Sequence, residues 1–214
     1  MGHRRLAGAV VTCVILSFAV GCGSADGLGS GAASKSSAPS STAPLLPRDG
    51  APAVADPLSL APLVQDRCAA PTKDQIETLG GAVRTVIPDS GFVDAGGPNT
   101  GCGWILADGL GNIVGGPVTS VHEGLSDLYG ANRAVTANGG QSTLRELAPV
   151  EGYPAIQSTQ GFEGDQSCIV LVGVSNTQVY GVRTSISQRH PYFRDACGLA
   201  SKVAAFAIQY LKTR

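Results

Sequence analysis

Six cysteines carry the most reactive side chains of this 214-residue chain. Two of them, Cys13 and Cys22, lie near the N-terminus. The other four are spread widely over the rest of the chain: Cys68, Cys102, Cys168 and Cys197. A thiol accepts a lipid, forms a disulfide or binds a metal, depending on compartment and spacing. No two of these cysteines have CxxC-like spacing, so a zinc site is the less favoured alternative.

The chemistry expected of Cys22 follows from the residues before it. A positive start with Arg4 and Arg5 precedes an apolar run from Leu6 to Val20. This run has the length of a secretory signal core and is shorter than the roughly 20 apolar residues that span a bilayer. Its end, Ala-Val-Gly-Cys at residues 19–22, resembles a bacterial lipoprotein signal. The resemblance implies cleavage of residues 1–21 and lipid attachment to Cys22 on the extracytoplasmic face of the cell membrane. An ordinary signal peptide with an incidental cysteine is the alternative.

The four remaining cysteines are predicted to form two disulfides, because an even number in an exported domain favours pairing. Three connectivities are possible. We expect Cys68–Cys102 and Cys168–Cys197, since each bond would join a terminal helical element to a strand. In the chain-entropy account each bond contributes roughly 3–4 kcal/mol to stability.

The histidines and the carboxylates near them match no complete catalytic motif. His122 and His190 are the only histidines beyond the expected signal peptide, and His122 opens HEGLSD rather than the HExxH of zinc peptidases. A surface turn is therefore favoured for His122. A hydrolase site around His122, Glu123 and Asp127 is the alternative. No GxSxG nucleophile motif occurs.

Other conspicuous residues are expected to be structural. Trp104 lies beside Cys102 and should pack in the core against a disulfide. The glycines at 109 and 111 lead into a strand rather than a helix, which favours a β-turn over a phosphate loop. Tyr192-Phe193 precedes the last helix and forms either a hydrophobic staple or an exposed aromatic patch.

Three segments divide the chain. Residues 1–21 are the expected signal peptide, and residues 22–55, rich in Gly, Ala, Ser and Pro, are expected to be a disordered, lipid-anchored tether. Residues 56–214 are long enough for one domain with a sizeable core. Removal of Arg4 and Arg5 would leave 13 Lys and Arg against 16 Asp and Glu, a net charge of about −3. Nucleic acid is therefore not an expected partner.

Helices are predicted at both ends of this domain. Thr72 and Gln75 have capping-box spacing and precede a short helix over 73–80. Asp195 caps a helix over 195–212 that has a wide apolar stripe. A further short helix is predicted over 123–129.

The strands are predicted from apolar runs and alternation between turn signals. The predicted strands are 102–106, 113–114, 117–121, 134–136, 143–150, 152–156, 168–174 and 179–186. The last two should form a hairpin in which Tyr180, Val182, Thr184 and Ile186 face the core. We therefore predict an α+β fold: a mainly antiparallel sheet with N-terminal and C-terminal helices packed on one face.

Several short motifs occur in a recognisable order. They are the Cys22 signal, Cys68 before a short helix, Gly101-Cys102-Gly103-Trp104, Gly152-Tyr153-Pro154-Ala155, and Asp195-Ala196-Cys197 at a helix start. In this order the chain resembles a domain-of-unknown-function family of actinobacterial cell-envelope lipoproteins, over nearly all of the mature chain. The resemblance implies an envelope location and disulfides but supplies no activity. A more distant similarity of layout to extracellular sensor domains of actinobacterial receptor kinases rests on analogy.

The functional expectation is a non-enzymatic, lipid-anchored binding or interaction module of the cell envelope. Its expected partners are the membrane, through the lipid on Cys22, and a small apolar ligand or an envelope protein. No cofactor or metal is expected. The alternatives are a regulatory lipoprotein of an envelope sensing system and an envelope hydrolase with an unrecognised site.

Overall fold

The computed structural model describes residues 45–91, 101–159 and 166–214. All of them belong to a compact unit that runs from Thr42 to Arg214. The expected signal peptide, the Cys22 lipid site and the first part of the expected tether lie outside the described residues.

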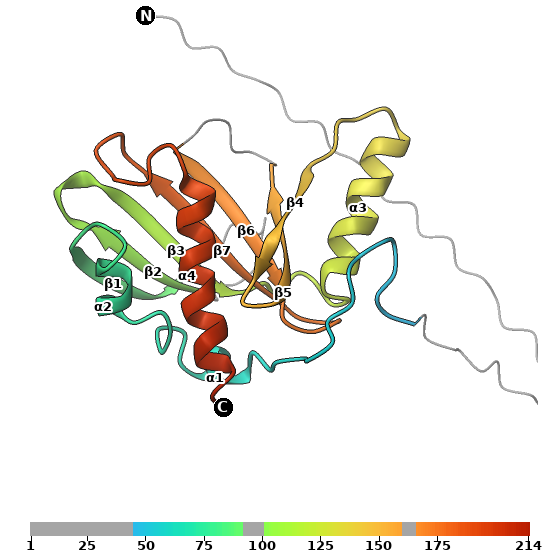
Figure 1. Cartoon of the computed structure of the whole chain (residues 1–214), viewed down its shortest axis with the longest axis horizontal. Coiled ribbons are helices and arrows are strands. Elements are labelled where there is room, and N and C mark those ends of the chain that lie inside the picture. Colours follow the sequence, from blue (N-terminus) through green and yellow to red (C-terminus); the bar gives the residue numbers. More distant parts are fainter. Residues whose placement is uncertain (1–44, 92–100, 160–165) are drawn as a thin grey trace, which may run out of the picture. The chain divides into compact units, whose positions relative to one another are not determined.

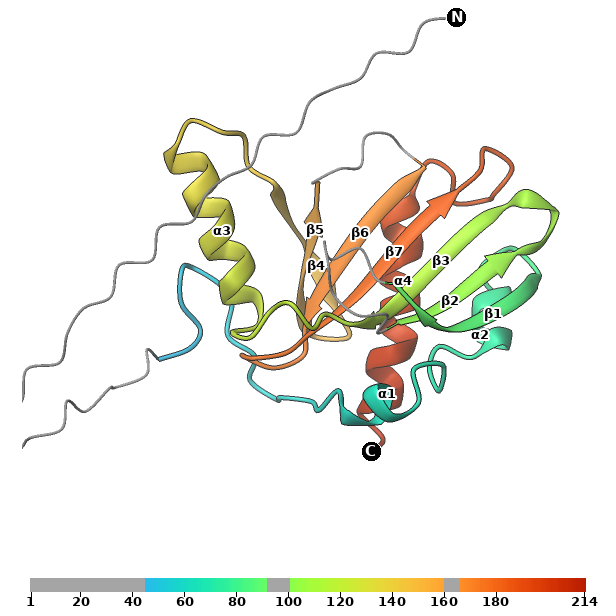
Figure 2. The ribbon, with the colours of Figure 1, turned by 180° about the vertical axis from the view of Figure 1, so that it is seen from behind.

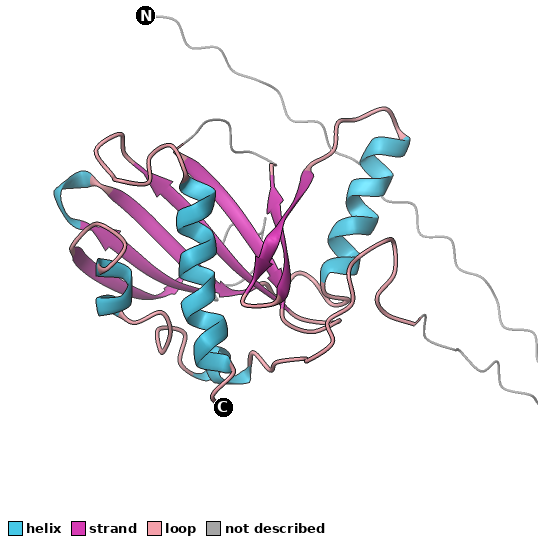
Figure 3. Cartoon of the chain, viewed as in Figure 1, coloured by secondary structure: helices cyan, strands magenta, loops and turns pink. Residues whose placement is uncertain are grey.

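Seven strands form one sheet in the order β1-β2-β3-β7-β6-β5-β4, and every neighbouring pair is antiparallel. The strands are β1 Val83–Ser90, β2 Gly101–Leu106, β3 Gly111–Pro117, β4 Leu144–Val150, β5 Tyr153–Ser158, β6 Ser167–Gly173 and β7 Val179–Ile186. The helices are α1 Ala61–Gln65, α2 Lys73–Glu77, α3 Leu125–Ala137 and α4 Ala196–Leu211, with a short 3-10 turn at Ala107–Gly109. Figures 1 and 3 show the sheet with α4 lying across it. The predicted α+β class is confirmed.

Helix α4 covers one face of the sheet and forms the main core with it. Its apolar stripe contains small residues, Ala200, Ala204 and Ala207, which are fully buried and let the helix approach β6 and β7 closely. Trp104 and Tyr180 are the largest buried side chains of this core. Each fully buried large apolar side chain contributes roughly 1.5–3 kcal/mol. The predictions that Trp104 is a core residue and that the C-terminal helix packs on the sheet are confirmed.

The opposite face has its own apolar cluster, which helix α3 covers in part. Leu125 of α3 is buried with Ile156 and Leu171, and Leu128 and Tyr129 pack at the border. Figure 2 shows this side of the molecule. We predicted helices on one face only, so α3 is an addition to that architecture.

Both predicted disulfides are present. The Cα–Cα distance is 5.1 Å for Cys68–Cys102 and 5.1 Å for Cys168–Cys197. The first joins the loop between α1 and α2 to β2, and the second joins β6 to the first turn of α4. Each end of the domain is thus covalently attached to the sheet.

The helix caps predicted at Thr72 and Asp195 are both present. The Thr72 hydroxyl accepts from the Gln75 amide while the Gln75 side chain accepts from the Thr72 amide, which is the predicted capping box. The Asp195 carboxylate accepts from the Gly198 amide at the start of α4. The β6–β7 hairpin is also confirmed, with Tyr180, Val182 and Ile186 in the α4-side core.

Two of the predicted strands are wrong. Residues 134–136 belong to α3, which extends the predicted helix 123–129 as far as Ala137. The Thr136 hydroxyl bonds back to the carbonyls of Asn132 and Arg133, so a β-branched residue is accommodated in the helix. Residues 117–121 are not a strand, because Pro117 ends β3 and the chain turns away towards α3.

The expected tether also ends earlier than residue 55. The described segment Leu45–Ala55 contacts the domain, with Ala51 and Val54 buried. The Val54 amide donates to Asn176 Oδ1 at 3.0 Å, and the Arg48 amide donates to the Ser126 hydroxyl at 3.0 Å. The burial of these two side chains and the two hydrogen bonds order this segment, although its composition had predicted disorder.

Candidate functional site

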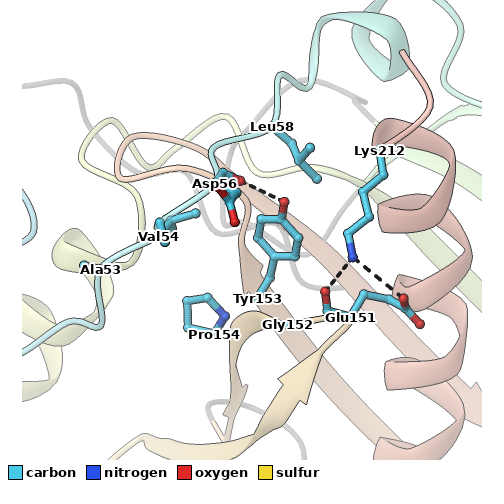
Figure 4. Close-up of a pocket in the computed structure, with 10 residues that line it drawn as sticks. Ala53, Val54, Asp56, Leu58, Glu151, Gly152, Tyr153, Pro154 and Lys212 are labelled. Atoms are coloured by element: carbon cyan, nitrogen blue, oxygen red, sulfur yellow. Dashed lines mark hydrogen bonds and ion pairs between the residues drawn. The ribbon is translucent and has the colours of Figure 1, made fainter.

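A cleft of about 430 Å³ opens where the N-terminal segment passes the end of α4. Figure 4 shows it. We call it the Tyr153 cleft, and its lining residues are Ala53, Val54, Ala55, Asp56, Leu58, Glu151, Gly152, Tyr153, Pro154 and Lys212. Three parts of the chain, far apart in sequence, therefore build one site: the segment 53–58, the turn between β4 and β5, and the C-terminal end of α4.

The turn between β4 and β5 places Tyr153 in this cleft. Glu151 has φ 53° and Gly152 has φ 89°, so the turn uses two left-handed residues. Glycine adopts such a conformation without steric cost, whereas Glu151 adopts it at some cost. The tight turn leads directly into Tyr153 and Pro154 at the start of β5, and both residues line the cleft (Figure 4).

The Tyr153 phenol is held by its neighbours. Its hydroxyl donates to the main-chain oxygen of Asp56 at 2.8 Å, and only 6% of the residue is exposed. Burial of the ring and, secondarily, the negative charge of Asp56 raise the pKa of Tyr153. The phenol therefore stays neutral at physiological pH and acts as a fixed donor.

Lys212, just after α4, supplies the cation of the cleft. Its Nζ donates to the main-chain oxygen of Glu151 at 2.7 Å and lies 3.9 Å from the Glu151 carboxylate. It also lies 5.4 Å from the centre of the Tyr153 ring, within cation–π range. Gln209 donates to the same carboxylate at 2.9 Å. Tyr153, Lys212 and Glu151 are thus each held in place by hydrogen bonds or an ion pair, an arrangement suited to positioning a ligand.

The candidate catalytic group of His122, Glu123 and Asp127 has structural contacts. The Asp127 carboxylate accepts from the amides of His122 at 2.7 Å and Glu123 at 2.9 Å, just before α3. The Glu123 carboxylate pairs with Arg48. The His122 side chain is exposed. Both carboxylates therefore hold the start of α3 and the N-terminal segment in place.

His190 lies in a turn after β7 and is buried. Its Nδ1 accepts from the Tyr192 amide at 3.1 Å, and burial lowers its pKa. A neutral imidazole that accepts a backbone hydrogen bond is a structural role. Within residues 45–91, 101–159 and 166–214, no three His, Cys, Asp or Glu side chains group as a metal site would require. No helix in the same part of the chain is long and apolar enough to cross a membrane.

The Tyr153 cleft is not predictable from the sequence alone. Gly152–Ala155 is recognisable as a motif, but nothing in the sequence links it to Lys212 or to residues 53–58. The one available signal was the Glu-Gly pair at 151–152 between two predicted strands, which marks a tight turn. The partners across the cleft are long-range contacts that only the fold brings together.

Comparison with known families gives a single result. The model of a family described as "Protein of unknown function (DUF3558)" matches residues 18–210. A search of curated proteins finds no match, and a search of solved structures finds none either. Because the match covers most of the chain, including every strand of the sheet and nearly all of α4, the chain belongs to the DUF3558 family of proteins of unknown function.

Proposed function

We propose that the protein is a non-enzymatic, lipid-anchored protein of the bacterial cell envelope that acts as a binding module. The observation that carries the proposal is the Tyr153 cleft, in which the Tyr153 hydroxyl bonds to the main-chain oxygen of Asp56 and the Lys212 ammonium bonds to the main-chain oxygen of Glu151. Groups held in this way present a fixed pattern to a ligand. The lining contains no serine, threonine, cysteine or histidine, the side chains that most often act as nucleophile or general base.

The size and lining of the cleft favour a small ligand. Its volume of about 430 Å³ lies within the ~300–1,000 Å³ typical of small-molecule sites. Val54, Leu58 and Pro154 offer apolar surface, while Lys212 offers a donor at the rim. We propose a ligand with an apolar body and a hydrogen-bond acceptor directed at the Lys212 ammonium.

The location is proposed from the sequence. The lipoprotein-like signal at residues 19–22 would place a lipid on Cys22, and the chain from Cys22 leads directly to the segment 45–55. This segment continues into residues 53–58, which form one wall of the Tyr153 cleft. The proposed anchor, Cys22, thus precedes Ala53 in the wall of the proposed ligand site by 31 residues.

Two mass measurements test the proposal. Protein extracted from its own membranes should begin at Cys22 and carry a lipid mass, and native mass spectrometry should show a second, non-covalent ligand mass. Ala53→Trp should remove that ligand mass by filling the cleft. Ala131→Trp, on the exposed side of α3, is the matched control and should retain it.

An unlipidated chain would refute the anchor. A protein that carries no ligand in either form, or the same ligand in both variants, would refute binding at this cleft.

A further inference from the structure

A second groove lies between β4 and α4 and is separate from the Tyr153 cleft, with which it shares only Glu151. Its main part measures about 450 Å³ and continues into a polar end of about 310 Å³. We call the two parts together the β4–α4 groove. Leu147 and Val150 of the strand and Gly198, Ser201 and Ala205 of the helix line the main part. The polar end is lined by Arg145, Gln157, Ser167, Arg194, Asp195, Ala196 and Cys197.

Strand β4 is an edge of the sheet, so one side of its backbone has no neighbouring strand among the residues that the structure describes. The Thr159 amide donates to the Thr143 carbonyl at 2.9 Å, which places the odd-numbered residues of β4 in the hydrogen-bonded set. Leu144, of the other set, bonds instead to the Ser142 hydroxyl. Alternation in an antiparallel ladder then directs the amide and carbonyl of Glu146 away from β5. An edge of this kind is a template for an added strand.

The polar end of the groove is positively charged. The side chains of Arg145 and Arg194 both line it, and neither side chain forms an ion pair or hydrogen bond with any residue that the structure describes. Lys202 lines the adjoining part, with its Nζ 5.9 Å from the centre of the Tyr192 ring. Among the residues that line the polar end, the one carboxylate is that of Asp195, and it caps α4. Two arginine side chains free for bidentate bonding match a carboxylate.

A buried acceptor at the same end has no donor. The Gln157 Oε1 atom is buried without a hydrogen-bond partner among the described residues. Buried polar atoms are nearly always satisfied, so this oxygen marks a place where a ligand N–H or a water would be favourable. A ligand that brings both a carboxylate and an amide N–H would satisfy the arginines and Gln157 together.

We propose that the β4–α4 groove binds the C-terminal end of an extended peptide. The peptide adds a short strand to β4 at Glu146 and places its apolar side chains between Leu147 and Ala205. Its terminal carboxylate binds Arg145 and Arg194, and a nearby peptide N–H donates to Gln157. This site goes beyond the proposed function, because it does not depend on whether the Tyr153 cleft holds a ligand.

The test uses the full oxidised chain in lipid nanodiscs and two peptide pools. Both pools contain random pentapeptides with a fluorescent N-terminal label, one ending in a free carboxylate and the other in an amide. Fluorescence anisotropy measures binding, and hydrogen exchange of the backbone amides reports strand addition. The variants are the pair Arg145→Gln with Arg194→Gln, and Arg84→Gln on β1, the other edge of the sheet, as the matched control.

The free-carboxylate pool should bind at least tenfold more tightly than the amidated pool, and the binding should protect the Glu146 amide from exchange. The double variant should lose that difference, while Arg84→Gln should keep it. Equal binding of the two pools, no change in exchange along β4, or an unaltered difference in the double variant would each overturn the proposal. These measurements do not involve Ala53. A negative result for the β4–α4 groove therefore does not affect the test of ligand binding in the Tyr153 cleft.

Discussion

At the scale of single residues, the main core contains a buried side-chain oxygen, that of Tyr180, with no hydrogen-bond partner in the described part of the chain. The Tyr180 hydroxyl is buried and unbonded among the described residues, whereas the Tyr153 hydroxyl donates to Asp56. Burial raises the pKa of Tyr180, which reflects the same lack of stabilising contacts for a charged oxygen. The hydroxyl groups of the two tyrosines therefore contribute to stability with opposite signs.

Tyr180→Phe should raise the free energy of unfolding by about 1 kcal/mol, because a buried hydroxyl without a hydrogen bond costs roughly 1–3 kcal/mol. Tyr153→Phe should lower it by about 1 kcal/mol, the usual net value of one hydrogen bond. Urea unfolding with both disulfides intact measures the two changes. A large loss of stability in Tyr180→Phe would contradict the assignment and indicate a bound water at that hydroxyl.

The Tyr180 hydroxyl also explains why a residue without a side chain occupies position 115. A Cβ at this position would lie 2.7 Å from the Tyr180 oxygen but 3.5 Å from the ring carbon that carries it. Gly115→Ala should therefore be destabilising in the native protein and better tolerated in Tyr180→Phe, with a coupling of about 1 kcal/mol. A double-mutant cycle on urea unfolding measures this coupling. Simple additivity of the two changes would show that the oxygen is not what excludes a side chain.

At the scale of elements, helix α3 is joined to β4 by one pair of polar side chains. The Tyr129 hydroxyl donates to Glu146 Oε1 at 2.8 Å. Burial, followed by this hydrogen bond and the charge of Glu146, raises the pKa of Tyr129 to about 12. Since the neutral phenol is favoured in the folded state, its contribution to stability is complete below pH 10 and is lost as the pH rises through about 12.

Glu146→Gln should lower the pKa of Tyr129 only part of the way towards 10, because burial is the largest cause and remains. Titration of tyrosinate absorbance measures this shift, with Tyr129→Phe identifying the signal. A pKa that falls all the way to 10 would show that Glu146, rather than burial, dominates. A pKa that does not move would show that the hydrogen bond to Glu146 is not formed in solution.

Elements with strong local signals were predictable from the sequence. Asp195 and the apolar stripe after it determine α4, and the alternation in 179–186 determines the face of β7 that meets the core. Helix α3 was predicted too short, because Val135 and Thr136 have high strand propensity. The side chains of α3 that pack on the second face of the sheet are Leu125, Leu128 and Tyr129, in the first turns of the helix. The cleft and the groove were not predictable, since each joins residues that only the seven-strand order brings together.

At the scale of the whole described unit, the N-terminal segment Leu45–Ala55 connects the chain to both α3 and the Tyr153 cleft. Arg48 pairs with Glu123, and Asp49 accepts from Arg133 at 3.2 Å. Val54 is buried, and its amide bonds to Asn176. Exposed ion pairs contribute about 0–1 kcal/mol each, whereas a buried valine contributes roughly 1.5–3 kcal/mol. Burial of Val54 should therefore hold this segment more firmly than its charges do.

Val54→Ala should consequently destabilise the protein by about 1–2 kcal/mol, and Arg48→Gln by less than about 1 kcal/mol, an effect that added salt should remove. Thermal and urea unfolding at low and high salt compare the two variants. Because residues 53–56 form a wall of the Tyr153 cleft, Val54→Ala should also weaken retention of the ligand, while Arg48→Gln should leave it unchanged. The reverse order of effects would mean that the ion pairs beside α3 hold the segment. In that case the proposed membrane tether would act on the cleft through charge rather than through packing.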